Sequence, residues 1–265
     1  MPAPTQLRLA PGLGAAEVHA HTLASDGVVT PEELVAAAAD VGINVLAITD
    51  HDTTASWERA IAAGVGLGVE VIAGEEVTTR APAGVHVVGL FLSEPVRMGM
   101  TIEDTVDAIH DQGGLAILAH PFMPTFFASI QQGRARRLLE THTVDGIELR
   151  HTAPIHGGAV RRLDRFYAAH RERLGAALGA GDSHFGRFDL GRMITTFPGR
   201  TAADLRAAIE NRTTSPLRGV EPAGPPLSLR IAQQRRSLLW LPNQRRIGAV
   251  GGGRGPRGSA GVAAP

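Results

Sequence analysis

The sequence predicts an α/β protein whose mostly parallel sheet is closed, or nearly closed, into a barrel. Short apolar runs alternate with helical stretches from about residue 15 to residue 216, which is typical of strands joined by crossover helices. Most of these apolar runs also stop at a His, Asp or Glu. In barrels the C-terminal ends of the strands converge on one face, where the active site is built. The polar strand ends therefore favour a barrel over an open doubly wound sheet.

Local signals place the individual elements. Thr30, Thr101 and Thr201 each precede a helical pattern and are followed three residues later by an acid, which predicts an N-capped helix start at each. Further helical patterns cover 129–141 and 157–171. Apolar runs that predict strands cover residues 44–49, 69–73, 85–92, 115–119, 144–149 and 176–178.

Composition divides the chain into three parts. We expect a leader over 1–14, a hydrolase domain over 15–218, and a tail rich in Pro, Gly and Arg over 219–265. One further helix is predicted over 227–241, and the chain beyond Arg246 has the composition of a disordered segment. The preferred interpretation is a solvated tail with one helix docked on the domain; binding of anions or of a partner is the alternative.

The overall composition excludes several classes of function. The 26 basic and 26 acidic side chains give no net charge, which argues against a scaffold that binds polyanions by bulk charge. The absence of cysteine excludes disulfides, thiolate zinc sites and a cysteine nucleophile. No apolar run approaches the roughly 20 residues needed to span a bilayer, and the first 14 residues lack a signal-peptide pattern. We therefore expect a soluble cytoplasmic protein that does not bind membranes.

The strongest local signal is the pair His19 and His21, followed by Asp26 in a Ser-Asp-Gly turn. Residues two apart on a strand point to the same side, so the two imidazoles can hold one ion together. Asp50-His51 forms a second signal, because a polar pair directly after an apolar strand has no packing reason to be there. Taken alone, this pair fits a ligand site and a helix cap equally well.

Metal-competent side chains also stand at the ends of other predicted strands: His86 opens one, and the others follow or close one, namely Glu75, Glu76, His120, Asp182 and His184. Each of them alone is explained by a loop acid or a structural histidine. Together they would require six separate strand ends to finish in such a residue by accident. The set therefore indicates a metal site built from imidazole and carboxylate, which suits manganese, iron or zinc.

In chain order these residues resemble the motifs of the PHP (polymerase and histidinol phosphatase) domain. The motifs that carry the resemblance are His19-Ala20-His21 with Asp26, Asp50-His51, Gly74 to Glu76, His86, His120-Pro121 and Asp182-Ser183-His184. The resemblance extends from about Glu17 to Pro216. The resemblance implies a distorted seven-stranded β/α barrel, two or three divalent ions, and phosphoester hydrolysis by a metal-activated hydroxide.

The resemblance also implies a role for each residue. The first ion would be held by His19, His21, Glu76 and Asp182. The second would share Glu76 and add His86 and His120, and the third would take Asp26, His51 and His184. Glu75 is the alternative to Glu76 if the turn is shifted by one residue. Catalytic roles fall to Glu76, Asp182 and His184, with His184 a candidate general acid.

Other positions are candidates for supporting roles. Arg150 and Arg187 lie closest in sequence to motif residues, and an arginine fork suits a phosphate. His151 follows a strand end where relatives often carry an aromatic residue, and it is a candidate for substrate contact or for a structural role. Asp50 and Asp52 are candidates for orienting the ligating histidines.

The preferred function is hydrolysis of small phosphate esters such as a nucleotide or a sugar phosphate. Between His86 and His120 the chain has no room for the long insertion of some nucleotide-cleaving relatives. A nuclease acting on short oligonucleotides and a metal-dependent hydrolase of C–N bonds are the alternatives. A non-catalytic module is disfavoured because the full ligand set is present. Oligomeric state is left open.

Overall fold

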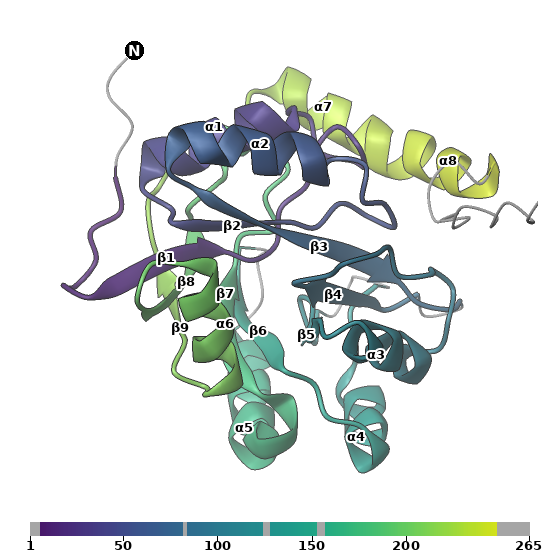
Figure 1. Cartoon of the computed structure of the whole chain (residues 1–265). Coiled ribbons are helices and arrows are strands. Elements are labelled where there is room, and N and C mark those ends of the chain that lie inside the picture. Colours follow the sequence, from purple (N-terminus) through teal and green to yellow (C-terminus); the bar gives the residue numbers. More distant parts are fainter. Residues whose placement is uncertain (1–5, 82–83, 124–127, 153–156, 248–265) are drawn as a thin grey trace, which may run out of the picture.

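The computed structural model confirms the α/β class and the barrel-like sheet, and it describes residues 6–81, 84–123, 128–152 and 157–247 (Figure 1). The described strands are β1 (Leu13–Glu17), β2 (Val45–Ile48), β3 (Glu70–Thr78), β4 (His86–Leu90), β5 (Leu115–Leu118), β6 (Gly146–His151), β7 (Ala176–Ala180), β8 (Met193–Pro198) and β9 (Ser215–Arg218). The described α-helices are α1 (Pro31–Val41), α2 (Trp57–Leu67), α3 (Ile102–Asp111), α4 (Gln132–Thr141), α5 (Gly157–Leu174), α6 (Ala202–Glu210), α7 (Leu227–Arg235) and α8 (Leu241–Ile247).

The sheet is mixed, where the sequence predicts one that is mostly parallel. Its strand order is β7-β6-β5-β4-β3-β2-β1-β8-β9. The pairs β1–β2, β2–β3, β5–β6 and β6–β7 are parallel, whereas β3–β4, β4–β5, β1–β8 and β8–β9 are antiparallel. Only seven residues connect β3 to β4, and a connection of that length permits an antiparallel pair but no parallel crossover. Strands β8 and β9 are two elements beyond the seven that the resemblance implies.

Polar contacts between β7 and its neighbours bring the sheet close to closure. Beyond β1 the chain stays extended, and Ala20 forms a parallel bridge with Ser183 just past β7. The hydroxyl of Thr195 on β8 accepts a hydrogen bond from the Gly179 amide at 3.0 Å and donates one to the Gly179 carbonyl at 2.8 Å. The first and seventh strands therefore end side by side.

One large apolar layer lies between strands β4 to β6 and helices α3, α4 and α5. Leu118, Leu138 and Ile147 are completely buried in it. The rings of Phe122 and Phe166 meet edge to face in the same layer, 5.1 Å apart. We refer to this region as the apolar layer; it fixes helices α3, α4 and α5, which lie in the lower part of the view in Figure 1.

The capping signals in the sequence correspond to real helix starts. The hydroxyl of Thr30 accepts a hydrogen bond from the Glu33 amide, while the Glu33 carboxylate accepts one from the Thr30 amide. Thr201 and Asp204 form the same reciprocal pair at α6. Helix α1 ends at Gly42, whose φ of 85° lies in the left-handed region that favours glycine.

The helix predicted over 227–241 begins where expected but continues further. Helix α7 passes through a π-helical turn (Arg236–Trp240) into α8, which ends at Ile247. We call residues 227–247 the C-terminal segment; it lies on the same side of the barrel as α1 and α2 (Figure 1). The disorder predicted beyond Arg246 falls almost wholly on 248–265, outside the described residues. Among the described helices, none is both long and apolar enough to cross a membrane.

Candidate metal centre

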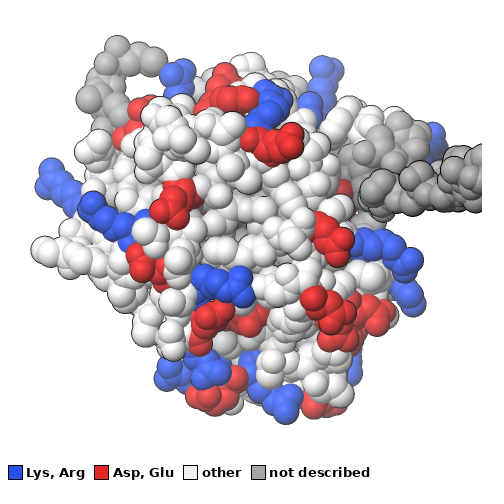
Figure 2. All heavy atoms as spheres, in the orientation of Figure 1, with Lys and Arg blue, Asp and Glu red and all other residues white. Residues whose placement is uncertain are grey.

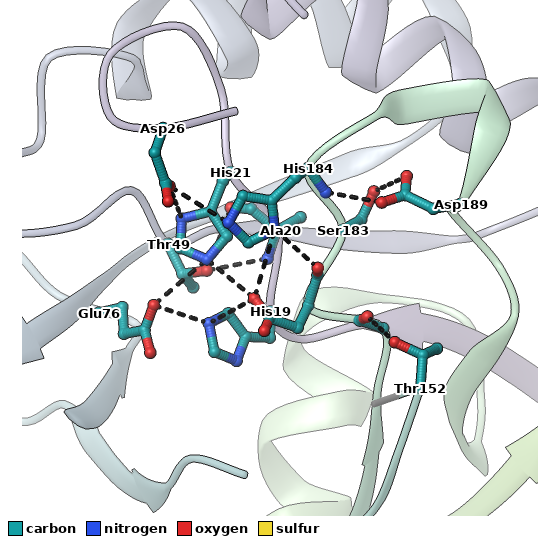
Figure 3. A network of polar contacts seen from close by, with 12 residues as sticks. His19, Ala20, His21, Asp26, Thr49, Glu76, Thr152, Ser183, His184 and Asp189 are labelled. Atoms are coloured by element: carbon teal, nitrogen blue, oxygen red, sulfur yellow. Dashed lines mark hydrogen bonds and ion pairs between the residues drawn. The ribbon is translucent and has the colours of Figure 1, made fainter. Parts of the chain in front are cut away.

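The structure brings all nine predicted ligands together at one end of the barrel. Figure 3 labels His19, His21, Asp26, Glu76 and His184 among them. Seven of them are buried and the other two are partly exposed. Seven of them come from segments that follow a strand, whereas Glu76 lies within β3 near its end and His86 begins β4. The nine residues are His19, His21, Asp26, His51, Glu76, His86, His120, Asp182 and His184.

Glu76 lies at the middle of the cluster and faces histidines with both of its oxygens. Oε2 is close to three imidazoles, at 3.0 Å from His19 Nε2, 3.2 Å from His21 Nε2 and 3.1 Å from His51 Nδ1. Oε1 is close to two others, at 2.6 Å from His86 Nδ1 and 3.0 Å from His120 Nε2. A carboxylate with this surrounding could be shared between two ions.

Its neighbour Glu75 points to the opposite side of β3. The Glu75 carboxylate accepts a hydrogen bond from the Val96 amide at 2.8 Å, as expected from the alternation of side chains along a strand. Burial raises the pKa of Glu75 to about 8. The geometry therefore places Glu76, and not Glu75, within the cluster.

The ligand atoms fall into three overlapping groups, within each of which all atoms lie within 4.8 Å of one another. The first consists of His19, His21, Glu76 and Asp182, the same residues that the resemblance assigns to the first ion. The second consists of His51, Glu76 and His86, and the third of His21, Asp26, His51 and His184. Relative to the assignments from sequence, His51 takes the place of His120 in the second group and His21 joins the third.

Asp26 divides its two oxygens between different partners. Oδ1 faces the third group, 3.2 Å from His184 Nε2, 3.7 Å from His21 Nδ1 and 3.9 Å from His51 Nε2. Oδ2 accepts a hydrogen bond from the side-chain amide of Gln233, at 3.4 Å. One oxygen is therefore directed at the cluster and the other is held by the C-terminal segment.

The electrostatics of the cluster follow from buried charges of opposite sign. Burial alone would raise the pKa of Glu76, but the surrounding imidazoles, His51 foremost, hold it well below its usual range. Burial lowers the pKa of His184, but Asp26 and Asp182 outweigh burial and raise that pKa to about 10. For His51 burial prevails and its pKa falls well below the usual range.

Several buried atoms of the cluster lack a hydrogen-bond partner, and they indicate whether these residues fit a metal ion. Among the described residues, His19 Nε2, Asp26 Oδ1 and His51 Nδ1 are buried and make no hydrogen bond of adequate geometry, although all three face the cluster. Leaving such atoms unpaired costs free energy, about 1–3 kcal/mol each. Divalent cations would satisfy them, and imidazole with carboxylate is a donor set that manganese, iron and zinc accept.

Glu148 supports the ligands in a way that the sequence analysis missed. Its completely buried carboxylate is 2.6 Å from His19 Nδ1 through Oε1 and accepts a hydrogen bond from the His120 amide at 2.6 Å through Oε2. It thereby fixes the ring of one predicted ligand and the backbone of another. The sequence held one signal for this role, namely an acid inside the apolar strand pattern 144–149.

The two acids proposed for that orienting role have other partners. Asp50 accepts hydrogen bonds from the Thr22 amide and hydroxyl, each at 2.7 Å, and from the Ser25 hydroxyl at 2.6 Å. Asp52 accepts one from the Thr78 amide at 2.7 Å. Asp50 therefore braces the loop that follows His21, and reaches the imidazole only through Ser25, whose Oγ is 3.4 Å from His21 Nδ1.

The ends of β1 and β7 are joined by a buried acid. Glu17 Oε1 accepts hydrogen bonds from the amides of His19 and Gly181, and burial raises the pKa of Glu17 to about 8. A Cβ at position 181 would lie 2.3 Å from Glu17 Oε2, so a larger residue there would require the Glu17 carboxylate to move. The next residue, Asp182, has a φ of 50°, a conformation that non-glycine residues adopt mainly where surrounding structure enforces it.

The three residues predicted to contact substrate lie in different surroundings. Arg150 is paired with Asp164 of α5 at 2.7 Å, so its guanidinium is directed to the outer helix and not to the cluster. His151 is buried, both its ring nitrogens lack a hydrogen bond, and burial lowers its pKa while Glu148 and Asp182 oppose the shift. Arg187 is exposed and lies over the Phe188 ring, 4.9 Å from its centroid.

Comparison with known proteins agrees with the geometry of the cluster. The family model of the PHP domain matches residues 17–210. A 3',5'-nucleoside bisphosphate phosphatase from Chromobacterium violaceum is 28% identical over 218 residues, covering 72% of this chain and 73% of the relative. A 5'-3' exoribonuclease from Salmonella typhimurium is 32% identical over 148 residues, covering 55% of this chain and only 42% of that enzyme.

A solved structure resembles most of the fold. It is a two-domain protein from Bacteroides vulgatus that contains a predicted PHP-like metal-dependent phosphoesterase. The TM-score is 0.69, with 20% identity, over 82% of this chain and 69% of the other. At this identity the similarity establishes the fold alone.

Proposed function

The chain belongs to the PHP domain family, and on this premise we propose that it is a metal-dependent phosphoesterase that hydrolyses small phosphate esters. The observation that carries the proposal is the position of Glu76, whose two oxygens face two separate sets of imidazoles. A shared carboxylate of this kind sets two ions at the short separation that phosphoester hydrolysis uses, about 3.5–4 Å.

The proposed cofactors are two or three divalent ions of manganese, iron or zinc. Three overlapping groups of ligand atoms support that number. When bound, such ions lower the pKa of water and neutralise phosphate charge. The chain holds them through the nine clustered side chains, while Glu148 fixes the ring of His19 and Glu17 fixes the backbone around it.

His151 is the proposed substrate contact among the three predicted ones. Its ring is buried and unpaired, and the charges of Glu148 and Asp182 act on it, so it lies beside the cluster with both nitrogens available. Arg187 is a second candidate, since it is exposed three residues after His184. Arg150 would first have to break its ion pair with Asp164, which makes it the weakest of the three.

The bisphosphate phosphatase supports a small nucleotide as the first substrate to test, because it matches this chain over most of both lengths. The exoribonuclease supports the alternative, cleavage of short RNA, but less than half of that enzyme is matched. On the face drawn in Figure 2, basic and acidic side chains are interspersed and form no continuous basic track. Small esters are therefore preferred.

The test is phosphate release by metal-stripped protein to which manganese is added back. The panel comprises a nucleoside 3',5'-bisphosphate, a nucleoside monophosphate, a sugar phosphate and a short oligonucleotide. We expect manganese-dependent release from one of the small esters, and a lower rate with the same ester in His151→Ala. Cleavage confined to the oligonucleotide, with a steep decline in binding as salt rises, would instead support the nuclease. Metal binding without any phosphate release would contradict both and favour a C–N hydrolase.

A further inference from the structure

The C-terminal segment (residues 227–247) lies outside the part of the chain that the family model matches, yet it is docked on two loops that carry predicted ligands. One is the loop from His21 to Asp26, and the other is the turn that contains His51 and Asp52. The tail that composition marks as an appendage is therefore in contact with the metal centre.

The most direct contact is between Gln233 and Asp26. Gln233 is a buried side chain on α7, and its amide donates to Asp26 Oδ2. The other oxygen, Oδ1, is buried without a hydrogen bond and faces the imidazoles of the third ligand group. Because a carboxylate rotates about its terminal bond, a donor on Oδ2 determines the direction in which Oδ1 points.

Arg236 fixes the backbone of the same loop. Its guanidinium donates to the carbonyls of Leu23, at 2.5 Å, and Ser25, at 2.8 Å, and it lies over the Trp240 ring, 4.4 Å from the centroid. The loop leads directly into Asp26. Arg236 therefore limits how far that ligand can move away from the cluster.

Arg245 makes the corresponding contact with the second loop. It pairs with Asp52 Oδ2 at 2.5 Å and donates to the Thr78 hydroxyl at 2.7 Å. Asp52 directly follows the predicted ligand His51, and its φ of 53° is unusual for a residue other than glycine. The segment thus spans the two loops that supply three of the four members of the third group.

We propose that the C-terminal segment completes the site of the third ion, with Gln233 as the positioning residue for Asp26. The inference rests on the proposed metal centre and adds to it a part of the chain that lies beyond the family's own domain. Ligands are commonly oriented by hydrogen bonds from residues behind them, and loss of such a partner lowers metal affinity by about 10–100-fold. The competing explanation is a contact that only stabilises the fold.

The test compares Gln233→Met with the wild-type full-length chain. Methionine keeps the length of the side chain and removes the amide donor. Manganese binding is titrated in the absence of substrate, and the metal retained per chain is counted by mass spectrometry after dialysis at limiting free manganese. We expect one binding step to weaken by about 10–100-fold and the remaining steps to be unchanged. Gln132→Met on α4 is the matched control and should bind like the wild type.

The outcomes separate this inference from the proposed function. A wild-type chain that binds no divalent metal would overturn both. Metal binding by the wild type, with an identical isotherm for Gln233→Met, would overturn only the role of the C-terminal segment. Equal weakening of every binding step, together with a lower melting temperature of the metal-free variant, would identify a fold contact and also overturn it. If Gln233→Met does not fold, Arg236→Gln is measured in the same way and judged by the same outcomes.

Discussion

The apolar layer and the metal centre are both buried in the same barrel, but different forces hold them. In the apolar layer, side chains such as Leu118, Leu138 and Ile147 are removed from water, which stabilises the fold by about 25 cal/mol per Å² of apolar surface. In the metal centre, burial brings together acids and imidazoles and leaves some of their atoms unpaired, which opposes folding. The apolar layer thus supplies the stability of the fold, and it supports the metal centre, which supplies the chemistry.

This contrast predicts that the two properties can be changed separately. A substitution in the metal centre should remove metal and activity with little loss of stability in the metal-free protein. A substitution in the apolar layer should lower stability and leave the folded molecules competent to bind metal.

The largest expected effect is that of Asp182→Ala. Asp182 Oδ1 lies 3.1 Å from His21 Nε2 and 3.5 Å from His19 Nε2, so the variant lacks a proposed ligand of the first ion. Because loss of an orienting partner alone costs about 10–100-fold, we expect kcat/KM for the preferred ester to fall by more than about 100-fold. The melting temperature of the metal-free variant should stay within a few degrees of the wild type. Near-normal turnover would show that the first ion is misassigned.

A change in the apolar layer should have the opposite result. Leu138 on α4 is completely buried, and Leu138→Ala should lower the free energy of unfolding by about 2–5 kcal/mol. Urea denaturation of the metal-free protein measures that loss, and metal bound per folded chain should be unchanged. Leu67→Ala is the control, because Leu67 is 47% exposed at the end of α2 and should change stability by less than about 0.5 kcal/mol. Loss of metal in Leu138→Ala would mean that the two regions are coupled.

The smallest expected effect concerns a surface pair outside both regions. His110 on α3 lies 2.7 Å from Asp145 Oδ2, and this hydrogen bond raises the pKa of His110. A raised pKa in the folded state stabilises the protein fully below the unfolded value of 6.5, and this contribution disappears as pH rises through the folded pKa.

His110→Gln should therefore destabilise the protein more at about pH 5.5 than at about pH 9. The difference should stay below about 1 kcal/mol, because the side chain of His110 is 35% exposed and solvent screens the pair. Denaturation at the two pH values measures it. A larger effect at the higher pH would reverse the assigned direction of the pKa shift.

Much of the fold and the cluster could be predicted because the ligands lie at strand ends. His19, His51 and His120 each follow an apolar run, and the convergence of strand ends explains why residues far apart in the sequence meet. The same signal could not decide whether Glu75 or Glu76 faces the cluster. Neighbouring residues on a strand point to opposite sides, and only the fold shows which side of β3 faces the cluster.

The remaining features depend on contacts that have no local signature. Strand β4 is antiparallel to both of its neighbours. Its direction depends on the short connection from β3, and the composition of the strand does not indicate it. Glu148 reaches His19 from 129 residues away, and Gln233 reaches Asp26 from 207 residues away. A buried acid and a tail glutamine are common residues, and neither indicates its partner before the fold is known.

The positions of the ligand groups along the sequence set the order in which the centre can form during synthesis. The group of His51, Glu76 and His86 spans 36 residues of sequence and is complete once the first third of the chain has left the ribosome. The other two groups need Asp182 or His184, which emerge more than 90 residues later. We therefore expect a nascent chain that ends before position 182 to hold at most one of the three groups, so that complete metal loading follows closure of the barrel.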